Sequence, residues 1–400
     1  MCASHRFIRI SVRPRISKNS LPASLVPADL NKQDVSFMRV ALSLAHRGLG
    51  SVWPNPAVGC VIVAERAGAP VVVGRGWTQP GGRPHAETVA LSQAGNLAKG
   101  ATAYVTLEPC CHHGKSPPCT DALIEAGVTC VVAAMEDPDS RVSGRGNALL
   151  KEAGIDVKVD LCRGEAERLN EGFILRVTEK RPMITLKTAT TLDGRIATAQ
   201  GESQWITGPN ARARVHLLRA SHDAVLVGIG TALADNPALT VRLPGLEAAS
   251  PVRIVVDTRL QLPLTANLVA TVADVPTWLL TAKGGDEAKL KAYRDRGVEI
   301  ITTPLDSAGY PDIHVAMQAL AGKGITRLLV EGGADIAAAF LRASLVDRIA
   351  WFRAPNIMGG DGVSAVAAYG LTQLDDILRF DTISSERLGN DWLETYWRSD

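Results

Sequence analysis

The sequence predicts a protein of two α/β domains, and three observations support this fold class. The chain has 400 residues, of which 46% are hydrophobic, and this length is roughly twice what one ordinary domain needs. Apolar runs of strand length alternate with helical patterns along both halves of the chain, as they do in layered α/β folds. No repeat of fixed period is visible, which argues against a solenoid.

The composition and the length of the apolar runs argue against two classes of protein. Forty-three Lys and Arg residues oppose 41 Asp and Glu residues, for a formal charge of +2, and aromatic residues make up 4% of the chain. The broad basic face and the stacking platforms that nucleic-acid binding needs are therefore not expected. The longest apolar runs, such as CVVAAM, are far shorter than the roughly 18 residues that cross a bilayer. A membrane-spanning protein is not expected either.

Residues 1–33 form a basic extension for which we expect disorder. The first 28 residues hold five basic residues and no acidic residue, and they are rich in Ser and Pro. A targeting leader has this composition, and so does a stretch that precedes the true start of translation. The sequence leaves these two alternatives open.

The first domain is expected over residues 34–180. It begins with an amphipathic helix from Asp34, where apolar residues recur at helical spacing as far as Gly48. The strands expected after it lie at 58–63, 71–74, 101–107 and 128–135. Further helices are expected after Pro84, at 120–127, in the segment that ends at Gly154 and in the charged stretch at 165–180.

The second domain is expected over residues 181–400, because a new strand begins directly after Arg181-Pro182. Strand patterns recur along it, separated by helical or loop segments. They lie at 183–189, 222–230, 252–258, 277–282, 297–303, 325–333 and 348–354.

The chain has seven cysteines, an odd number, and they are scattered along it, so they do not indicate a disulfide framework. We therefore place the chain in a reducing compartment, the cytoplasm. Three of the cysteines nevertheless fall within Cys110–Cys119. In a reducing compartment such local density indicates metal binding or thiol chemistry.

His85, Cys110 and Cys119 are expected to bind a catalytic zinc ion. Three protein ligands leave the fourth tetrahedral position open for water, whereas a structural site would normally use a fourth Cys or His. His85 and Glu87 open a helix and lie about 200° apart around its axis, so they converge only off its N-terminus. Glu87 is then placed to carry a proton from water to a departing amine.

Other interpretations of this motif stay open. The cluster could be ordinary core residues, His112 or His113 could close a structural zinc site, and Cys111 could replace Cys110. The signature of zinc deaminases, His-x-Glu followed by Pro-Cys-x-x-Cys, favours the residue directly after Pro, which is Cys110. The chain departs from that signature, because eight residues instead of two separate Cys110 from Cys119. The longer loop leaves room for contacts to a larger substrate.

The second domain carries less explicit signals. Val227-Gly228-Ile229-Gly230 follows a strand, but Leu233 stands where the GxGxxG pattern needs its third Gly, so a Rossmann fold is not supported. Glu331-Gly332-Gly333 could cradle a phosphate at a helix N-terminus or form a plain turn. Arg219 and Arg242 could clamp an anionic substrate or lie on the surface as solvated residues.

Several motifs, in this order, make the chain resemble the bifunctional deaminase/reductase of riboflavin biosynthesis from about Val35 to the C-terminus. They are NPAVGCVIV, PHAE, TLEPCCHHGKSPPC, DPDSRVSGRG, TLDGRIAT, GESQWIT, TALADNPALTVR and VEGG. The resemblance implies a cytidine-deaminase-like three-layer domain followed by a dihydrofolate-reductase-like α/β domain. It also implies hydrolytic deamination of a diaminopyrimidine ribosyl phosphate with release of ammonia. Reduction of the ribosyl side chain to ribityl by NADPH would follow.

The resemblance assigns site residues in both domains. In the deaminase, His85, Cys110 and Cys119 match zinc ligands, Glu87 matches the proton shuttle, Asn55 a pyrimidine contact, and His112 and Lys115 residues near the substrate phosphate. The residues that match the reductase substrate site are Ser203, Arg219, Leu239, Arg242 and Glu331. Those that match the NADPH site are Ala189, Trp205, Thr231, Asp235, Thr258 and a stretch that starts with Gly333, Ala334 and Asp335. Lys187 and Asp235 are further candidates for supporting hydride transfer. Thr78 and Cys111 replace the His and Ser of many members.

The sequence therefore predicts a zinc- and NADPH-dependent bifunctional enzyme that acts on a small pyrimidine ribosyl phosphate, with no nucleic-acid or membrane partner. The oligomeric state stays open, a homo-oligomer included. A nucleic-acid base deaminase, the first rival, would show a short Pro-Cys-x-x-Cys motif and a basic groove. A zinc-stabilised nucleotide-binding regulator, the second rival, would hold zinc but release no ammonia.

Overall fold

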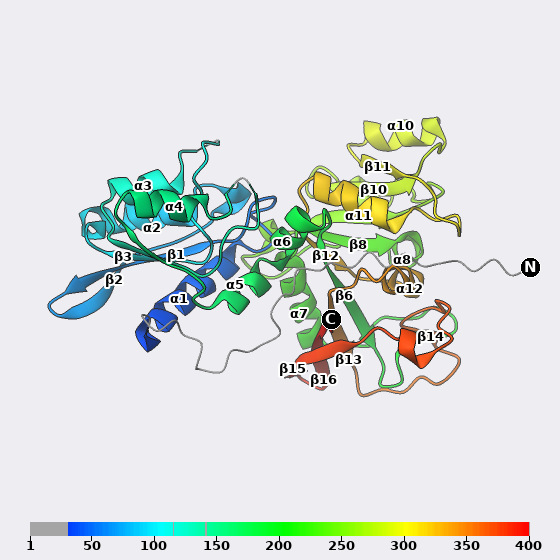
Figure 1. Cartoon of the computed structure of the whole chain (residues 1–400). Helices are drawn as coiled ribbons and strands as arrows, with labels where there is room; N and C mark the ends of the chain where they lie inside the picture. The colour runs from blue at the N-terminus through cyan, green and yellow to red at the C-terminus, as the bar shows by residue number, and fades with distance from the viewer. Residues whose placement is uncertain (1–30, 115, 141, 400) are drawn as a thin grey trace, which may run out of the picture.

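The computed structural model describes residues 31–114, 116–140 and 142–399 and shows two α/β units, each built around its own sheet (Figure 1). The predicted α/β fold class is confirmed. Most of the basic extension, residues 1–30, lies outside the described residues. No helix of the described part of the chain is long and apolar enough to cross a membrane.

The N-terminal unit has a five-stranded sheet in the order β2-β1-β3-β4-β5. β1 pairs antiparallel with β2 and β3, whereas β3, β4 and β5 run parallel. Helices α2, α3 and α4 cover one face and α1 and α5 the other, so the unit has three layers (Figure 1). The strands are β1 Gly59–Arg66, β2 Ala69–Trp77, β3 Thr102–Val105, β4 Cys130–Ala133 and β5 Asp156–Lys158. The helices are α1 Lys32–Ala45, α2 Ala86–Ala94, α3 Cys119–Glu125, α4 Arg145–Glu152 and α5 Arg163–Leu169.

The first helix begins two residues before Asp34, where the apolar pattern starts. The Asn31 side chain accepts hydrogen bonds from the backbone N–H of Gln33 and Asp34, at 2.7 and 3.1 Å. The Asp34 carboxylate accepts one in return from the Asn31 N–H at 2.7 Å, which completes a capping box. Met38 and its apolar neighbours on the same helix face are buried against the sheet.

The charged stretch before Arg181 folds into two helices, α5 and α6 (Glu171–Thr178). Asn170 separates them, and its buried side-chain amide bonds the backbone N–H and C=O of Ala57 at 2.9 and 3.0 Å. At the start of α6, Glu171 accepts a hydrogen bond from Nε of Arg348 at 2.8 Å. Because Ala57 belongs to the first unit and Arg348 to the second, these two helices join the units.

The C-terminal unit has a nine-stranded sheet in the order β11-β10-β9-β8-β12-β6-β13-β16-β15. The strands from β11 to β13 run parallel, and β16 and β15 are added antiparallel. The strands are β6 Met183–Thr190, β8 Ala224–Gly228, β9 Val252–Val256, β10 Thr277–Ala282, β11 Glu299–Thr303, β12 Arg327–Val330, β13 Arg348–Arg353, β15 Phe380–Leu388 and β16 Asp391–Arg398. The helices are α7 Pro209–Ala220, α8 Ile229–Asp235, α9 Asn267–Ala270, α10 Glu287–Asp295, α11 Ile313–Gly322 and α12 Ala334–Arg342. A small separate sheet pairs β7 Arg195–Ala197 with β14 Val363–Ser364.

The seven strands predicted for the second half all form. Five of them, β6, β8, β9, β10 and β12, are mostly apolar runs buried on both faces, whereas β11 and β13 are only partly buried. In β8, Leu226 packs with α11 and α12 on one face, whereas Val225 and Val227 pack with residues on the opposite face. The hairpin of β15 and β16 was not predicted. β15 is an exposed edge strand rich in polar residues, so it contains no apolar run.

Candidate functional site

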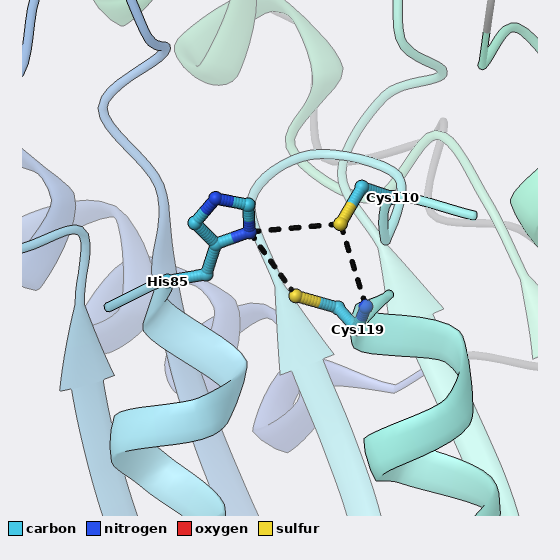
Figure 2. Close-up of side chains that lie close together, drawn as sticks. All are labelled: His85, Cys110 and Cys119. Carbon is cyan, nitrogen blue, oxygen red and sulfur yellow. Dashed lines mark hydrogen bonds between the residues drawn. The ribbon is translucent and has the colours of Figure 1, made fainter. Parts of the chain in front are cut away.

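His85, Cys110 and Cys119 converge from three separate elements of the N-terminal unit (Figure 2). His85 is the cap residue of α2, Cys119 is the first residue of α3, and Cys110 lies in the loop after β3. Nδ1 of His85 lies 3.3 Å from Sγ of Cys119 and 3.5 Å from Sγ of Cys110. All three ligand atoms lie within 4.8 Å of one another.

This donor set fits a zinc ion. Zn–N and Zn–S bonds of about 2.1 and 2.3 Å at a tetrahedral angle place nitrogen and sulfur about 3.6 Å apart, close to the separations found. The Cys119 thiol, which hydrogen-bonds Cys110, lowers the pKa of the Cys110 thiol, and this favours the thiolate form that binds metal. Cys111 is half-buried, and His112 and His113 are exposed. Among the described residues, none of these three belongs to the ligand group.

Glu87 is the second residue of α2 and is 4% exposed. Burial, together with the negative charge of Cys110, raises the pKa of Glu87 to about 7, and its carboxyl group is a hydrogen-bond partner of Cys119. A carboxyl group whose pKa lies near neutrality can both accept and donate a proton. The placement agrees with the expectation that His85 and Glu87 converge at the helix N-terminus.

Glu108, which the sequence analysis did not single out, holds the loop that carries Cys110. Its buried carboxylate accepts hydrogen bonds from the backbone N–H groups of Asp137, Gly144 and Asn147, at 3.1, 2.9 and 3.1 Å. The segment from 137 to 147 is thereby fastened behind Cys110. In the sequence, Glu108 could have been found as the acidic residue two positions before Cys110, the first Cys ligand.

Asn55 lies on the loop between α1 and β1, against Gly82. A Cβ atom on Gly82 would lie 1.7 Å from Nδ2 of Asn55, so only glycine leaves room for this side chain. Gly82 also has a φ of +82°, which disfavours other residues. Because Gly82 comes three residues before His85, the contact places Asn55 beside the zinc-ligand segment.

The loop between Cys110 and Cys119 contacts Arg83, a residue that was not among the candidates from the sequence. Nε of Arg83 donates a hydrogen bond to Oγ of Ser116 at 3.4 Å, and the guanidinium group lies beside Gly114. Lys115, expected near the substrate phosphate, lies outside the described residues. In the sequence, Arg83 could have been found as the basic residue two positions before the zinc ligand His85.

The two departures from the family pattern have different environments. Thr78 is buried, and its hydroxyl oxygen accepts a hydrogen bond from the Val58 N–H at 3.0 Å, so it ties the end of β2 to the start of β1. Burial raises the pKa of the Cys111 thiol. Thr78 therefore serves the packing of the sheet.

In the C-terminal unit, the residues that match an NADPH site collect at the carboxyl ends of four adjacent strands. Thr258 follows β9, Thr231 and Asp235 lie on α8 after β8, Gly333 to Asp335 follow β12, and Ala189 is near the end of β6. In open parallel sheets this edge is where ligands bind. Glu331-Gly332-Gly333, which by its sequence is either a phosphate cradle or a plain turn, also lies at this edge.

The two glycine turns pack side by side at this edge. The Gly228 N–H donates to the carbonyl oxygen of Gly332 at 3.1 Å. A Cβ atom on Gly333 would lie 3.2 Å from Oγ1 of Thr231. Gly333 is the cap residue of α12, so backbone N–H groups are free of side chains at the helix N-terminus.

Arg219 is buried rather than solvated, and it forms a two-pronged ion pair with Glu331. Its Nε and Nη2 donate to the two carboxylate oxygens at 2.6 and 2.8 Å, and Nη1 donates to the carbonyl oxygen of Thr240 at 2.9 Å. Arg219 lowers the pKa of Glu331 against the effect of burial. Burial lowers the pKa of Lys187, while the charges of Glu331 and Asp235 oppose this effect. These four residues form one charged cluster.

Of the remaining expected substrate and cofactor residues, Arg242 and Leu239 adjoin this cluster through Thr240, whereas Ser203 and Trp205 lie on the loop before α7. Nη1 of Arg242 donates to Oγ1 of Thr240 at 3.4 Å, and Leu239 next to Thr240 is buried. Trp205 is 66% exposed and stacks with the guanidinium of Arg212, 4.6 Å from the ring centroid. Ser203 lies half-buried two residues before Trp205, in the loop that precedes α7.

Comparisons with known proteins agree with this arrangement of domains. Residues 31–135 match the cytidine and deoxycytidylate deaminase zinc-binding region, and residues 182–393 match the RibD C-terminal domain. The riboflavin biosynthesis protein RibD of Aquifex aeolicus is 43% identical over 358 residues, 90% of this chain and 96% of the relative. RibD of Escherichia coli is 43% identical over 372 residues, 90% of this chain and 98% of the relative.

Solved structures show the same likeness over both units. Acinetobacter baumannii RibD has a TM-score of 0.82 at 37% identity, covering 92% of this chain and 99% of the other. A Thermotoga maritima protein described as a diaminohydroxyphosphoribosylaminopyrimidine deaminase/5-amino-6-(5-phosphoribosylamino)uracil reductase has a TM-score of 0.79 at 34% identity, with the same coverage.

The fold and the two matched regions define a two-domain enzyme, a zinc-binding deaminase followed by a dihydrofolate-reductase-like domain. The similarity extends over nine-tenths of the chain. The chain belongs to the RibD family of riboflavin biosynthesis, whose members join a pyrimidine deaminase to a ribosyl reductase.

Proposed function

We propose that the N-terminal domain, residues 34–180, deaminates 2,5-diamino-6-(5-phosphoribosylamino)pyrimidin-4(3H)-one, and that residues 181–400 reduce the product with NADPH. One observation supports the first step above all. His85, Cys110 and Cys119 converge beside the buried carboxyl group of Glu87. A zinc ion held by these three residues supplies an activated water molecule for attack on the ring carbon.

The protein's own groups handle the proton and the ring. Glu87 accepts a proton on its carboxylate and passes it to the departing amino group, which leaves as ammonia, because its pKa near 7 makes both directions accessible. Asn55, held against Gly82, contacts the pyrimidine. Since the hydrogen-bonding groups are fixed before the substrate arrives, little reorganisation is needed.

The loop between Cys110 and Cys119 receives the ribosyl phosphate. His112 and Lys115 are the contacts that the family pattern assigns there, and we add Arg83, whose guanidinium reaches this loop at Ser116. A planar guanidinium binds phosphate oxygens in pairs, so Arg83 adds orientation as well as charge.

In the second domain, NADPH binds along the carboxyl edge of β9, β8, β12 and β6, with Thr231, Thr258 and the N-terminus of α12 as contacts. Ala189, Trp205 and Asp235 complete the proposed cofactor site. NADPH supplies a hydride to C1' of the open sugar, and a proton balances the reduction.

Ser203, Leu239 and Arg242 contact the substrate, and the Arg219–Glu331 ion pair holds the carboxylate of Glu331 toward Lys187. The cytoplasmic location stays a prediction from cysteine usage.

The deciding experiment incubates the purified chain with the diaminopyrimidine ribosyl phosphate, with and without NADPH, and follows both products by mass. Without NADPH we expect one equivalent of ammonia and the aminouracil product. With NADPH we expect that product to gain two hydrogen atoms. A chain that binds zinc but releases no ammonia would support the nucleotide-binding regulator instead.

A further inference from the structure

We infer that the reductase domain holds the substrate loop of the deaminase in place, and that Trp53 and Pro54 are positioning residues for deamination. The substrate loop here means residues 51–56, which include Asn55. The inference rests on the proposed function in one respect, because it takes Asn55 as a contact of the pyrimidine.

One side of the substrate loop lies against the second unit. Trp53 is half-buried and packs against the hydrophobic core that α11 and α12 form with the large sheet. Directly after α11, a Cβ atom on Gly324 would lie 3.1 Å from Cβ of Pro54 and 3.4 Å from Cε3 of Trp53. Nearby, a Cβ atom on Gly50 would lie 2.3 Å from the carbonyl oxygen of Ala220, so the two backbones touch.

The other side of the substrate loop lies against the zinc-ligand segment. The Gly81 N–H donates to the carbonyl oxygen of Ser51 at 2.8 Å, and Asn55 fills the space beside Gly82. Gly82 leads into His85 within three residues. The loop is therefore held between the reductase core and the segment that carries the zinc ligand.

Three consecutive residues complete this connection. Trp53 and Pro54 contact the reductase domain, and the side chain of Asn55, the next residue, lies against Gly82 in the segment that leads to the zinc ligand His85. A loop anchored at adjacent residues cannot shift at one without shifting at the other. A displaced contact binds the pyrimidine less tightly, and a loss of about 1.4 kcal/mol of binding raises the KM about tenfold. The reductase domain therefore helps to set the position of Asn55.

The first test displaces the substrate loop by a substitution in the reductase domain. In Gly324→Ala, the new methyl group presses on Pro54. The φ of +103° at Gly324 also strains the backbone, so a control must carry the same strain. Gly297 follows α10 as Gly324 follows α11, has a φ of +89°, and has only Val272 near its Cβ position, at 3.6 Å. Gly297→Ala is that control.

The expected result is a change in substrate binding with the zinc site intact. For Gly324→Ala we expect the KM of deamination to rise about tenfold, with bound zinc, kcat of reduction and KM for NADPH within about twofold of the wild type. Gly297→Ala should leave the KM of deamination unchanged. Trp53→Ala should raise the same KM, and Trp53→Phe should restore most of the loss, because an aromatic ring refills the packing.

The outcomes separate the inference from the proposed function. A wild-type chain that releases no ammonia overturns the proposed function and this inference with it. An active wild type with Gly324→Ala and Trp53→Ala both at wild-type KM overturns the inference alone. Equal effects of Gly324→Ala and Gly297→Ala also overturn it, because backbone strain and not the contact with Pro54 would then be the cause.

Discussion

Glu87 is the residue on which the deaminase depends most directly. It lies within hydrogen-bonding reach of Cys119 but is not one of the three ligands, so its substitution separates proton transfer from metal binding. For Glu87→Gln, which keeps the shape of the side chain, we expect bound zinc to stay at the wild-type level. Ammonia release should fall by at least about a hundredfold. Metal analysis and an ammonia assay measure the two quantities, and undiminished ammonia release would contradict the assignment.

Arg83 is a second residue whose role is open to a direct test. Its guanidinium lies at the inter-cysteine loop, near Ser116, where we place the substrate phosphate. We expect Arg83→Gln to raise the KM of deamination about tenfold, the effect of losing about 1.4 kcal/mol of binding, with kcat nearly unchanged. Arg75→Gln is the matched control, because Arg75 is an exposed arginine of β2 in the same domain. Equal KM values for the two variants would remove Arg83 from the phosphate site.

Substitution of Arg242 tests the proposed substrate site of the reductase. It is the most exposed of the cations around Glu331, so its removal leaves the buried Arg219–Glu331 pair intact. We expect Arg242→Ala to lower kcat/KM for NADPH oxidation with the deaminated intermediate by about tenfold or more. Ammonia release from the diaminopyrimidine should continue at the wild-type rate. A parallel fall in both activities would show that the two sites are not independent.

At the scale of secondary-structure elements, the zinc site depends on how loops are fastened to helix N-termini. Glu108 fixes the loop after β3 by accepting three backbone hydrogen bonds. Glu108→Ala would leave the buried N–H groups of Asp137 and Asn147 without this partner, at about 1–3 kcal/mol each, together with the partly buried N–H of Gly144. We expect a lower melting temperature and faster loss of zinc to a competing chelator. Glu152→Gln, at an exposed position of α4, should change neither. Wild-type zinc retention in Glu108→Ala would show that the loop does not need this carboxylate.

The elements differ in how well the sequence predicted them. Strands buried on both faces, such as β8 and β10, were predicted because long apolar runs have few alternatives. The edge strand β15 was missed because its residues are mostly polar and exposed. The stretch at 165–180 was expected to be helical, but its break at Asn170 depends on the contact of this side chain with Ala57, more than 100 residues earlier.

At the scale of the whole molecule, the two units place their sites on different sheets, one at helix N-termini and one at a strand edge. Removal of zinc should therefore affect one activity only. After treatment with a chelator, we expect ammonia release to be lost and then restored by added zinc. NADPH oxidation with the deaminated intermediate should stay at its initial rate. Loss of both activities after chelation would mean that zinc also supports the fold of the reductase unit.

Local patterns in the sequence predicted the two-domain organisation, most strands, and the three candidate zinc ligands. These features depend on local periodicity and on the spacing of His85, Glu87, Cys110 and Cys119, which need no knowledge of packing. The ion pair between Arg219 and Glu331 and the packing of Trp53 against the reductase core could be found only in the folded structure. Such contacts join residues more than 100 positions apart, and their partners are selected by how the sheets and helices pack, which no local pattern encodes.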